Sequence, residues 1–183
     1  MIDFTRPADL VAPELLGCVI SHRGVSVRLT EVEAYLGAED AAAHTYRGMT
    51  PRNAAMFGPP GRLYVYLSYG LHLAGNLVCA PEGTGQGCLM RAGEVVTGHD
   101  LAYRRRGDVP FQRLASGPGN LGKTLGLTLE DNGTPVTVEL PDRAPEWVAG
   151  PRIGISKNVD APLRFWIPGH PTVSARRGRP RGA

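Results

Sequence analysis

The chain has 183 residues, of which 42% are hydrophobic and 20% charged, enough for one compact domain with its own core. Its formal charge is +3, but four arginines fall in the last eight residues, so the remainder is close to neutral. The three cysteines lack CxxC spacing, no apolar run approaches the ~18 residues of a membrane span, and the N-terminus lacks a signal-peptide layout.

These features predict a single domain over residues 1–175 and a basic, disordered tail over residues 176–183. We expect a cytoplasmic monomer, nucleoid-associated in a bacterium, with no secretion signal, no membrane association and no metal. The tail either adds sequence-independent attraction to phosphates or is simply solvated.

The first predicted elements are a short helix and a β-hairpin. Residues 13–17 are typical of a helix that ends at glycine. Residues 18–21 and 25–35 alternate apolar and polar side chains, as half-buried strands do, on either side of a turn.

Two glutamates stand near the end of the second of these strands. If the alternation through Leu29 continues, Glu31 and Glu33 point inward, where an unpaired charge is costly. That conflict indicates a functional site. A β-bulge at Val32 would instead reset the phase and leave both acids solvated or paired with arginine.

The next segments alternate loops, hairpins and short helices. A loop covers residues 36–49, and Thr50 and Pro51 are expected as the N-cap and first position of a short helix. A hairpin follows, with strands at 62–68 and 71–79. Further strands are expected at 87–91, 136–140, 152–156 and 163–167, and helices at 94–103 and near 120–126.

Since strands outnumber helices and are joined mostly by hairpins, the pattern predicts an α+β fold. We expect a curved, mainly antiparallel sheet with a protruding β-hairpin and surrounding short helices.

The hairpin carries three tyrosines and, on its return strand, one amide. Tyr64 and Tyr66 share a face, and ordinary packing is enough to explain them. Packing does not explain Tyr69 at the tip, where an aromatic ring suits a wedge or a stacking platform for DNA. Asn76 interrupts an apolar strand and either bonds to backbone or meets a polar ligand.

A metal-dependent nuclease is an alternative reading of the acidic residues. Asp40 and His44 follow Glu31 and Glu33 closely, and carboxylates suit hard metal ions. The chain lacks an HExxH or HxxEH spacing and the cysteine and histidine pattern of a nucleobase deaminase. His44 alone would be an ordinary core or surface histidine.

Many short motifs, in one order over residues 6–175, together resemble the alkyladenine (3-methyladenine) DNA glycosylase family. They include Leu15-Leu16-Gly17, Glu31-Val32-Glu33-Ala34-Tyr35, residues 39–44, Thr50-Pro51-Arg52-Asn53, residues 60–66, Tyr69-Gly70, Asn76, Leu89-Met90-Arg91-Ala92, Ser116-Gly117-Pro118, Arg152-Ile153-Gly154-Ile155 and Pro162-Leu163-Arg164-Phe165.

The resemblance implies an enzyme that flips damaged purines such as 3-methyladenine out of double-stranded DNA and hydrolyses the glycosidic bond without a cofactor. Glu33 would be the general base that activates a water against C1′, with Arg91 and the carbonyl of Ile153. Glu31 would be a supporting or solvated acid. The competing class is a catalytically silent DNA- or RNA-binding module.

The same resemblance implies a base pocket and a DNA-contacting surface. Asn76 would crowd the 2-amino group of guanine, and Tyr69 would fill the gap left in the duplex. The implied pocket residues are Tyr35, Ala42, His44, Tyr66, Asn76 and Leu89, and the implied DNA contacts are Tyr69, Leu71, Thr50, Arg52 and Lys123. Departures from the family pattern include a loop at residues 44–50 that is one residue shorter than in the vertebrate enzymes, Leu71 in place of a methionine, and Asn120 where the family often has lysine.

Overall fold

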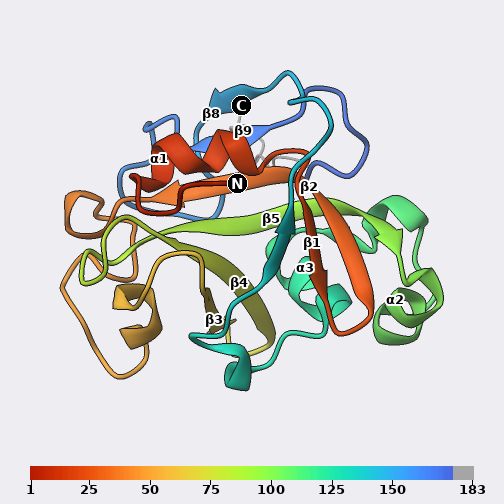
Figure 1. Cartoon of the computed structure of the whole chain (residues 1–183), viewed down its shortest axis with the longest axis horizontal. Coiled ribbons are helices and arrows are strands. Elements are labelled where there is room, and N and C mark those ends of the chain that lie inside the picture. The colour runs from red at the N-terminus through yellow and green to blue at the C-terminus, as the bar shows by residue number, and fades with distance from the viewer. Residues whose placement is uncertain (175–183) are drawn as a thin grey trace, which may run out of the picture.

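The structure is a computed structural model that describes residues 1–174. The predicted basic tail therefore lies outside the described residues. A mainly antiparallel nine-stranded sheet forms the centre, and short helices surround it in a single domain (Figure 1). The α+β fold predicted from the sequence is confirmed. Within residues 1–174, no helix is long and apolar enough to cross a bilayer.

The elements alternate strands with short helices along the whole chain. The strands are β1 Val19–His22, β2 Val25–Tyr35, β3 Leu63–Ser68, β4 His72–Cys79, β5 Gln86–Thr97, β6 Ala115–Ser116, β7 Thr137–Glu139, β8 Val148–Gly150 and β9 Arg164–Trp166. The α-helices are α1 Ala8–Val11, α2 His99–Arg106 and α3 Pro118–Leu125, and the 3-10 helices are η1 Ala12–Leu15, η2 Gly37–Glu39, η3 Ala54–Phe57, η4 Phe111–Arg113 and η5 Leu129–Asp131.

Strands β2 and β5 form the long spine of the sheet, whose order is β3-β4-β5-β2-β1-β7. Helix α3 packs on β4 and β5 and buries Leu121 and Leu125 in the main core. It approaches so closely that a Cβ at Gly122 would collide with the carbonyl of Leu73. This close contact holds the middle of α3 against β4.

The boundary between β5 and α2 differs from the expectation of a helix over residues 94–103. Glu94 and Val95 continue β5 and pair with Arg28 and Val27 of β2. Branched residues suit this paired, half-buried surface better than a helix. Gly98, with φ +77°, ends the strand, and α2 begins one residue later.

Two further predicted elements are wrong. Thr50 does not cap a helix, because the 3-10 helix begins only at Ala54 and its N-cap is Asn53. The Thr50 N–H instead donates to Asn53 Oδ1 at 2.7 Å within the preceding turn. Residues 152–156 form no strand but an irregular segment in which Gly154 has φ +75°. The first helix also begins earlier than expected, at Ala8.

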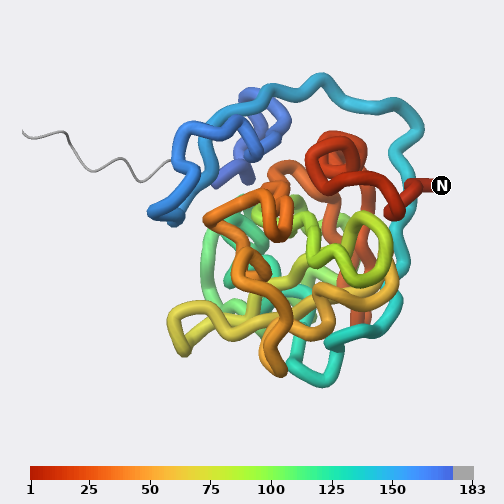
Figure 2. Tube along the Cα trace, turned by 90° about the vertical axis from the view of Figure 1, so that its left-hand side faces the viewer, coloured from red at the N-terminus to blue at the C-terminus, as the bar shows by residue number. Residues whose placement is uncertain are grey.

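The β3–β4 hairpin projects from the body of the molecule, as expected, and appears in yellow in Figure 2. Its chain reversal places Tyr69 and Gly70 at positive φ, and the Leu71 N–H donates to the Ser68 carbonyl at 3.1 Å. The side chains at the tip are open to solvent: Tyr69 is 86% and Leu71 77% exposed.

Candidate active site

The two acids of β2 lie opposite the core because the strand is irregular. The pairing of β2 with β5 shifts on both sides of Glu31, so Val32 and Ala34 join Leu29 in the core. Glu31 and Glu33 then point to the other face. The bulge considered from the sequence is therefore present, but both side chains are nevertheless 0% exposed. Arg164 and Ser174 surround Glu31, and Tyr35 and Ile153 lie against Glu33.

Glu31 is held by the C-terminal part of the chain. It accepts hydrogen bonds from Arg164 Nε at 2.6 Å and from the N–H and hydroxyl of Ser174 at 2.7 and 2.6 Å. Arg91 Nε lies 3.2 Å from it. The alternative of a solvated Glu31 is wrong, since its carboxylate is buried and surrounded by donors.

Glu33 has fewer charged neighbours than Glu31. Its Oε1 accepts the Ile153 N–H at 2.8 Å, its Oε2 accepts the Tyr35 hydroxyl at 2.9 Å, and Arg91 lies 3.6 Å away. Burial raises the pKa of Glu33, although Arg91 and the two hydrogen bonds oppose that rise. A carboxylate with a raised pKa is suited to accept a proton.

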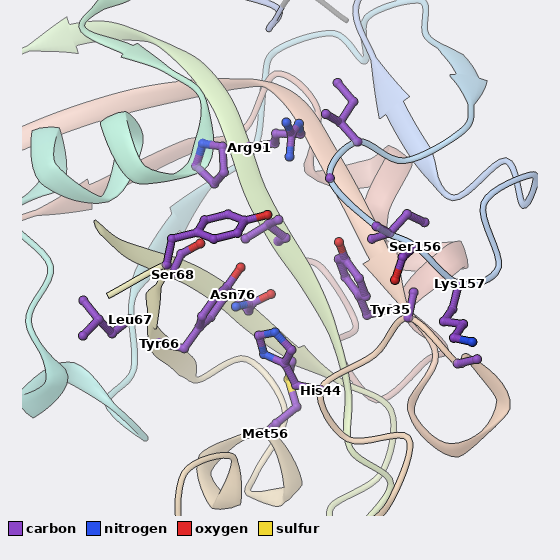
Figure 3. A pocket seen from close by; sticks show the side chains of 18 residues that line it. Tyr35, His44, Met56, Tyr66, Leu67, Ser68, Asn76, Arg91, Ser156 and Lys157 are labelled. Atoms are coloured by element: carbon purple, nitrogen blue, oxygen red, sulfur yellow. The ribbon is translucent and has the colours of Figure 1, made fainter. Parts of the chain in front are cut away.

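A cavity of about 500 Å³ is lined by Tyr35 and Arg91, two of the residues that contact Glu33 (Figure 3). Its aromatic walls come from β2, from β3 and from the loop after β2. The His44 ring meets the Tyr66 ring edge-on at 4.5 Å, and Tyr64 stacks behind Tyr66 at 5.7 Å. Partial burial lowers the pKa of His44, which keeps the imidazole neutral at pH 7.

Most residues expected at the site surround this cavity. Those that line it are Tyr35, Ala42, His44, Tyr66, Tyr69, Asn76, Leu89, Arg91 and Ile153. Glu33 lies directly behind three of them, Tyr35, Arg91 and Ile153. Thr50, Arg52, Leu71 and Lys123 are exposed and are not among the described residues that line the cavity.

The sequence reading missed several residues of the cavity wall. Ser156 lines it from the segment that was expected to be a strand, Lys157 follows directly, and Pro118 lines it from the start of α3. Ser156 and Lys157 directly follow the family motif Arg152-Ile153-Gly154-Ile155, so their place in the sequence could have marked them as wall residues. Met56 closes the wall from η3.

The acids and histidine considered for a metal site lie in different surroundings. Asp40 forms a two-point ion pair with Arg152, at 2.6 and 2.8 Å, whereas Glu31 bonds to Arg164. His44 faces the aromatic wall. Within residues 1–174, no three histidine, cysteine or acidic side chains are placed to hold a metal ion. This arrangement does not fit the donor set of a nuclease.

A second cavity, of about 450 Å³, shares Arg91 and Ile153 with the first. Arg106 and Arg113 line it, together with Asn120 and Ser174. Three arginines at one cavity favour an anionic ligand. Arg91 is shared by both cavities, and its Nε has no aligned hydrogen-bond partner within the described part of the chain.

Comparison with known proteins agrees with this geometry. The model of the methylpurine-DNA glycosylase family matches residues 2–171. Relatives bearing the name "Putative 3-methyladenine DNA glycosylase" include one from Corynebacterium efficiens, 69% identical over 98% of this chain and 97% of its own. One from Cutibacterium acnes is 52% identical over 97% and 100%, and one from Mycobacterium leprae is 49% identical over 94% and 86%. The chain belongs to the methylpurine-DNA glycosylase family, which confirms the resemblance and makes it a DNA glycosylase of DNA repair.

Proposed function

We propose that this enzyme flips an alkylated or deaminated purine out of double-stranded DNA into the aromatic cavity and hydrolyses its N-glycosidic bond with a water activated by Glu33. The observation that carries this proposal is the position of Glu33. Its buried carboxylate lies behind a base-sized cavity and touches three residues of the wall. A target base inside a duplex can reach such a cavity only by leaving the stack.

The proposed reaction needs one general base, Glu33, and no metal ion. The water oxygen attacks C1′ while the bond from C1′ to the purine nitrogen breaks, and that electron pair leaves with the base. Glu33 takes the proton of the water, and its negative charge stabilises the oxocarbenium character of the sugar. The product is an abasic site in an unbroken strand.

Three groups support Glu33 in this role. The Ile153 N–H holds Oε1 in place. The carbonyl of the same residue would help to hold the water, as the family resemblance implies. The Tyr35 hydroxyl fixes Oε2. Arg91 lines both cavities, and its guanidinium would contact the sugar and the water between them.

The walls of the cavity suit a damaged purine. Tyr35, Tyr66 and His44 present aromatic surface for stacking, and an alkylated purine is often cationic. A desolvated cation over an electron-rich ring gains ~2 kcal/mol or more. Asn76 places an amide at the same wall, where it would crowd the 2-amino group of an undamaged guanine.

The surface around the cavity suits duplex DNA. Tyr69 stands exposed at the hairpin tip beside the cavity mouth and would fill the gap left by the flipped nucleotide, flanked by Leu71. The arginine-lined second cavity would take backbone phosphate. Thr50, Arg52 and Lys123 are exposed and would add contacts to the phosphates of the DNA backbone.

The test is a screen of the purified protein against duplexes that each carry one 3-methyladenine, 7-methylguanine, hypoxanthine or ethenoadenine. We expect at least one alkylated base to be released, with strand breaks appearing only after alkali and with EDTA having no effect. The Glu94→Gln variant, which alters a partly exposed acid paired with Arg28, should match the parent.

Failure to release any of the four bases would leave the alternative of a silent binding module. Strand cleavage without alkali, or loss of activity in EDTA, would favour a nuclease.

Gel filtration with and without a lesion duplex tests the further expectation that the enzyme acts as a monomer.

A further inference from the structure

The ion pair between Asp40 and Arg152 lies against the aromatic wall but takes no part in the reaction described above. Both side chains are 0% exposed. The Arg152 guanidinium carbon lies over the Tyr35 ring, 4.6 Å from its centroid. Tyr35 lines the cavity and Arg152 is not among the described residues that do, so the ring separates this cation from the cavity.

Asp40 is the only anion bound directly to this guanidinium among the described residues. Its carboxylate accepts hydrogen bonds from both terminal nitrogens of Arg152, from the Asn158 side-chain amide, and from the backbone N–H groups of Leu36 and Ala42. Burial alone would raise the pKa of Asp40, but the bonds from Arg152 and Asn158 hold it below its usual value. Asp40 therefore stays ionised and balances the charge of Arg152.

The neutrality of the Asp40–Arg152 pair matters because Arg152 covers only one face of the Tyr35 ring, and a base can stack on the other. A base stacked on the free face of Tyr35 would lie roughly 8 Å from the guanidinium, given stacking contacts of about 3.5–4 Å. With the carboxylate in place the pair is neutral, and the ring can still attract a cationic base. Without it, the guanidinium would repel that base and leave a neutral base almost unaffected.

We propose that Asp40 and Arg152 set the preference of the pocket between cationic and neutral damaged purines, with Asp40 masking the cation behind Tyr35. This inference rests on the proposed function, because it assumes that the purine stacks on Tyr35. Asp40 and Arg152 act through the Tyr35 ring and are positioning and specificity residues, not catalytic ones.

The experiment compares binding of two duplexes in a Glu33→Gln background, so that neither is consumed. One carries 7-methylguanine, whose nucleotide is cationic, and the other carries hypoxanthine, which is neutral. The measured quantity is the ratio of the two dissociation constants, because a general loss of folded protein or of packing changes both constants alike.

Adding Asp40→Asn should weaken the preference for the cationic base by roughly 5- to 30-fold, the upper figure being one unscreened charge at 8 Å and an effective dielectric constant near 20. Adding Arg152→Gln instead should leave that preference unchanged or strengthen it, because it removes the repelling charge and keeps the carboxylate. The double change Asp40→Asn with Arg152→Gln should return the ratio to within about threefold of the starting protein.

The different effects expected of Asp40→Asn and Arg152→Gln on the ratio of dissociation constants distinguish electrostatic masking from a purely structural role. An unchanged ratio with Asp40→Asn overturns the inference, as does an equal fall with Arg152→Gln. If Asp40→Asn does not fold, the ratio in the Arg152→Gln and double variants still decides, since a fall in either contradicts masking. Failure of the parent enzyme to release any base would overturn the proposed function, a different result in a different assay.

Discussion

Glu31 and Glu33 lie two residues apart on β2, and their different neighbours give them different tasks. Glu31 is saturated by Arg164 and by both donors of Ser174, so it stabilises the fold. Glu33 meets two neutral donors and a more distant Arg91, which leaves its pKa raised and its carboxylate able to accept a proton. Environment, not residue type, separates the structural acid from the proposed base.

Asn76 is the residue whose substitution should change selectivity without removing the reaction. It is 3% exposed, and its amide donates to the Tyr64 carbonyl at 3.3 Å while it lines the cavity. Asn76→Ser shortens the side chain, so guanine-derived bases should enter more readily. The measurement is the ratio of excision rates for a mispaired guanine and for hypoxanthine, which should rise.

The matched control is Asn132→Ser. Asn132 bonds to the N–H and carbonyl of Val65 on the same hairpin but is not among the described residues that line the cavity. It should lower stability and leave the ratio unchanged. An equal ratio in the parent and in Asn76→Ser would show that Asn76 has only a structural role, through its hydrogen bond to the Tyr64 carbonyl.

At the scale of elements, alternation predicted most strands, and the irregular segments could not be predicted. The period of two placed β2 and the β3–β4 hairpin correctly. It could not show the register shifts around Glu31, because they depend on pairing with β5. The sequence of residues 152–156 resembles that of a strand. Contacts with distant segments decide its conformation instead, because Arg152 is held by Asp40 and the N–H of Ile153 is bound by Glu33.

The hairpin tip gives the prediction that belongs to this scale. Tyr69 is 86% exposed and contributes little to the core, so Tyr69→Ala should leave the melting temperature nearly unchanged. If its ring replaces lost stacking, worth ~1–3 kcal/mol, affinity for a lesion duplex should fall by roughly 5- to 150-fold. The loss should shrink on a single strand, where no gap needs filling.

Tyr103→Ala is the matched control, because Tyr103 is also an exposed tyrosine but lies on α2. It should bind both substrates like the parent. Equal losses on duplex and single-stranded substrates in Tyr69→Ala, or a large drop in its melting temperature, would rule out the wedge.

At the scale of the whole molecule, the C-terminal segment closes the site from behind. Arg164 and Ser174 join this segment to Glu31 at the centre of the sheet. Thr172 adds a buried hydrogen bond to Thr30 at 2.7 Å. The segment therefore excludes water behind Glu31 and completes the second cavity, which Ser174 lines.

Glu31→Gln should show how much this closure contributes to stability. Breaking a buried charge network by removing one partner typically costs about 3–5 kcal/mol. For a chain of this length that corresponds to a melting temperature lower by roughly 6–20 °C. The control Glu94→Gln breaks a partly exposed pair with Arg28 and should cost at most ~1 kcal/mol. Similar shifts in the two variants would contradict the structural role of Glu31.

The central claim, that Glu33 activates the water, is tested most directly by the single-turnover rate of base release against pH in the parent and in Glu33→Gln. The parent rate should fall in acid, below a pKa above the ordinary carboxylate value of 4.5, because Glu33 must be ionised to accept a proton and burial raises its pKa. Glu33→Gln should be slower by roughly 10²–10⁴-fold and lose that acid limb, while still binding an abasic duplex. A variant that releases the base at the parent rate, or keeps the same acid limb, would contradict the account.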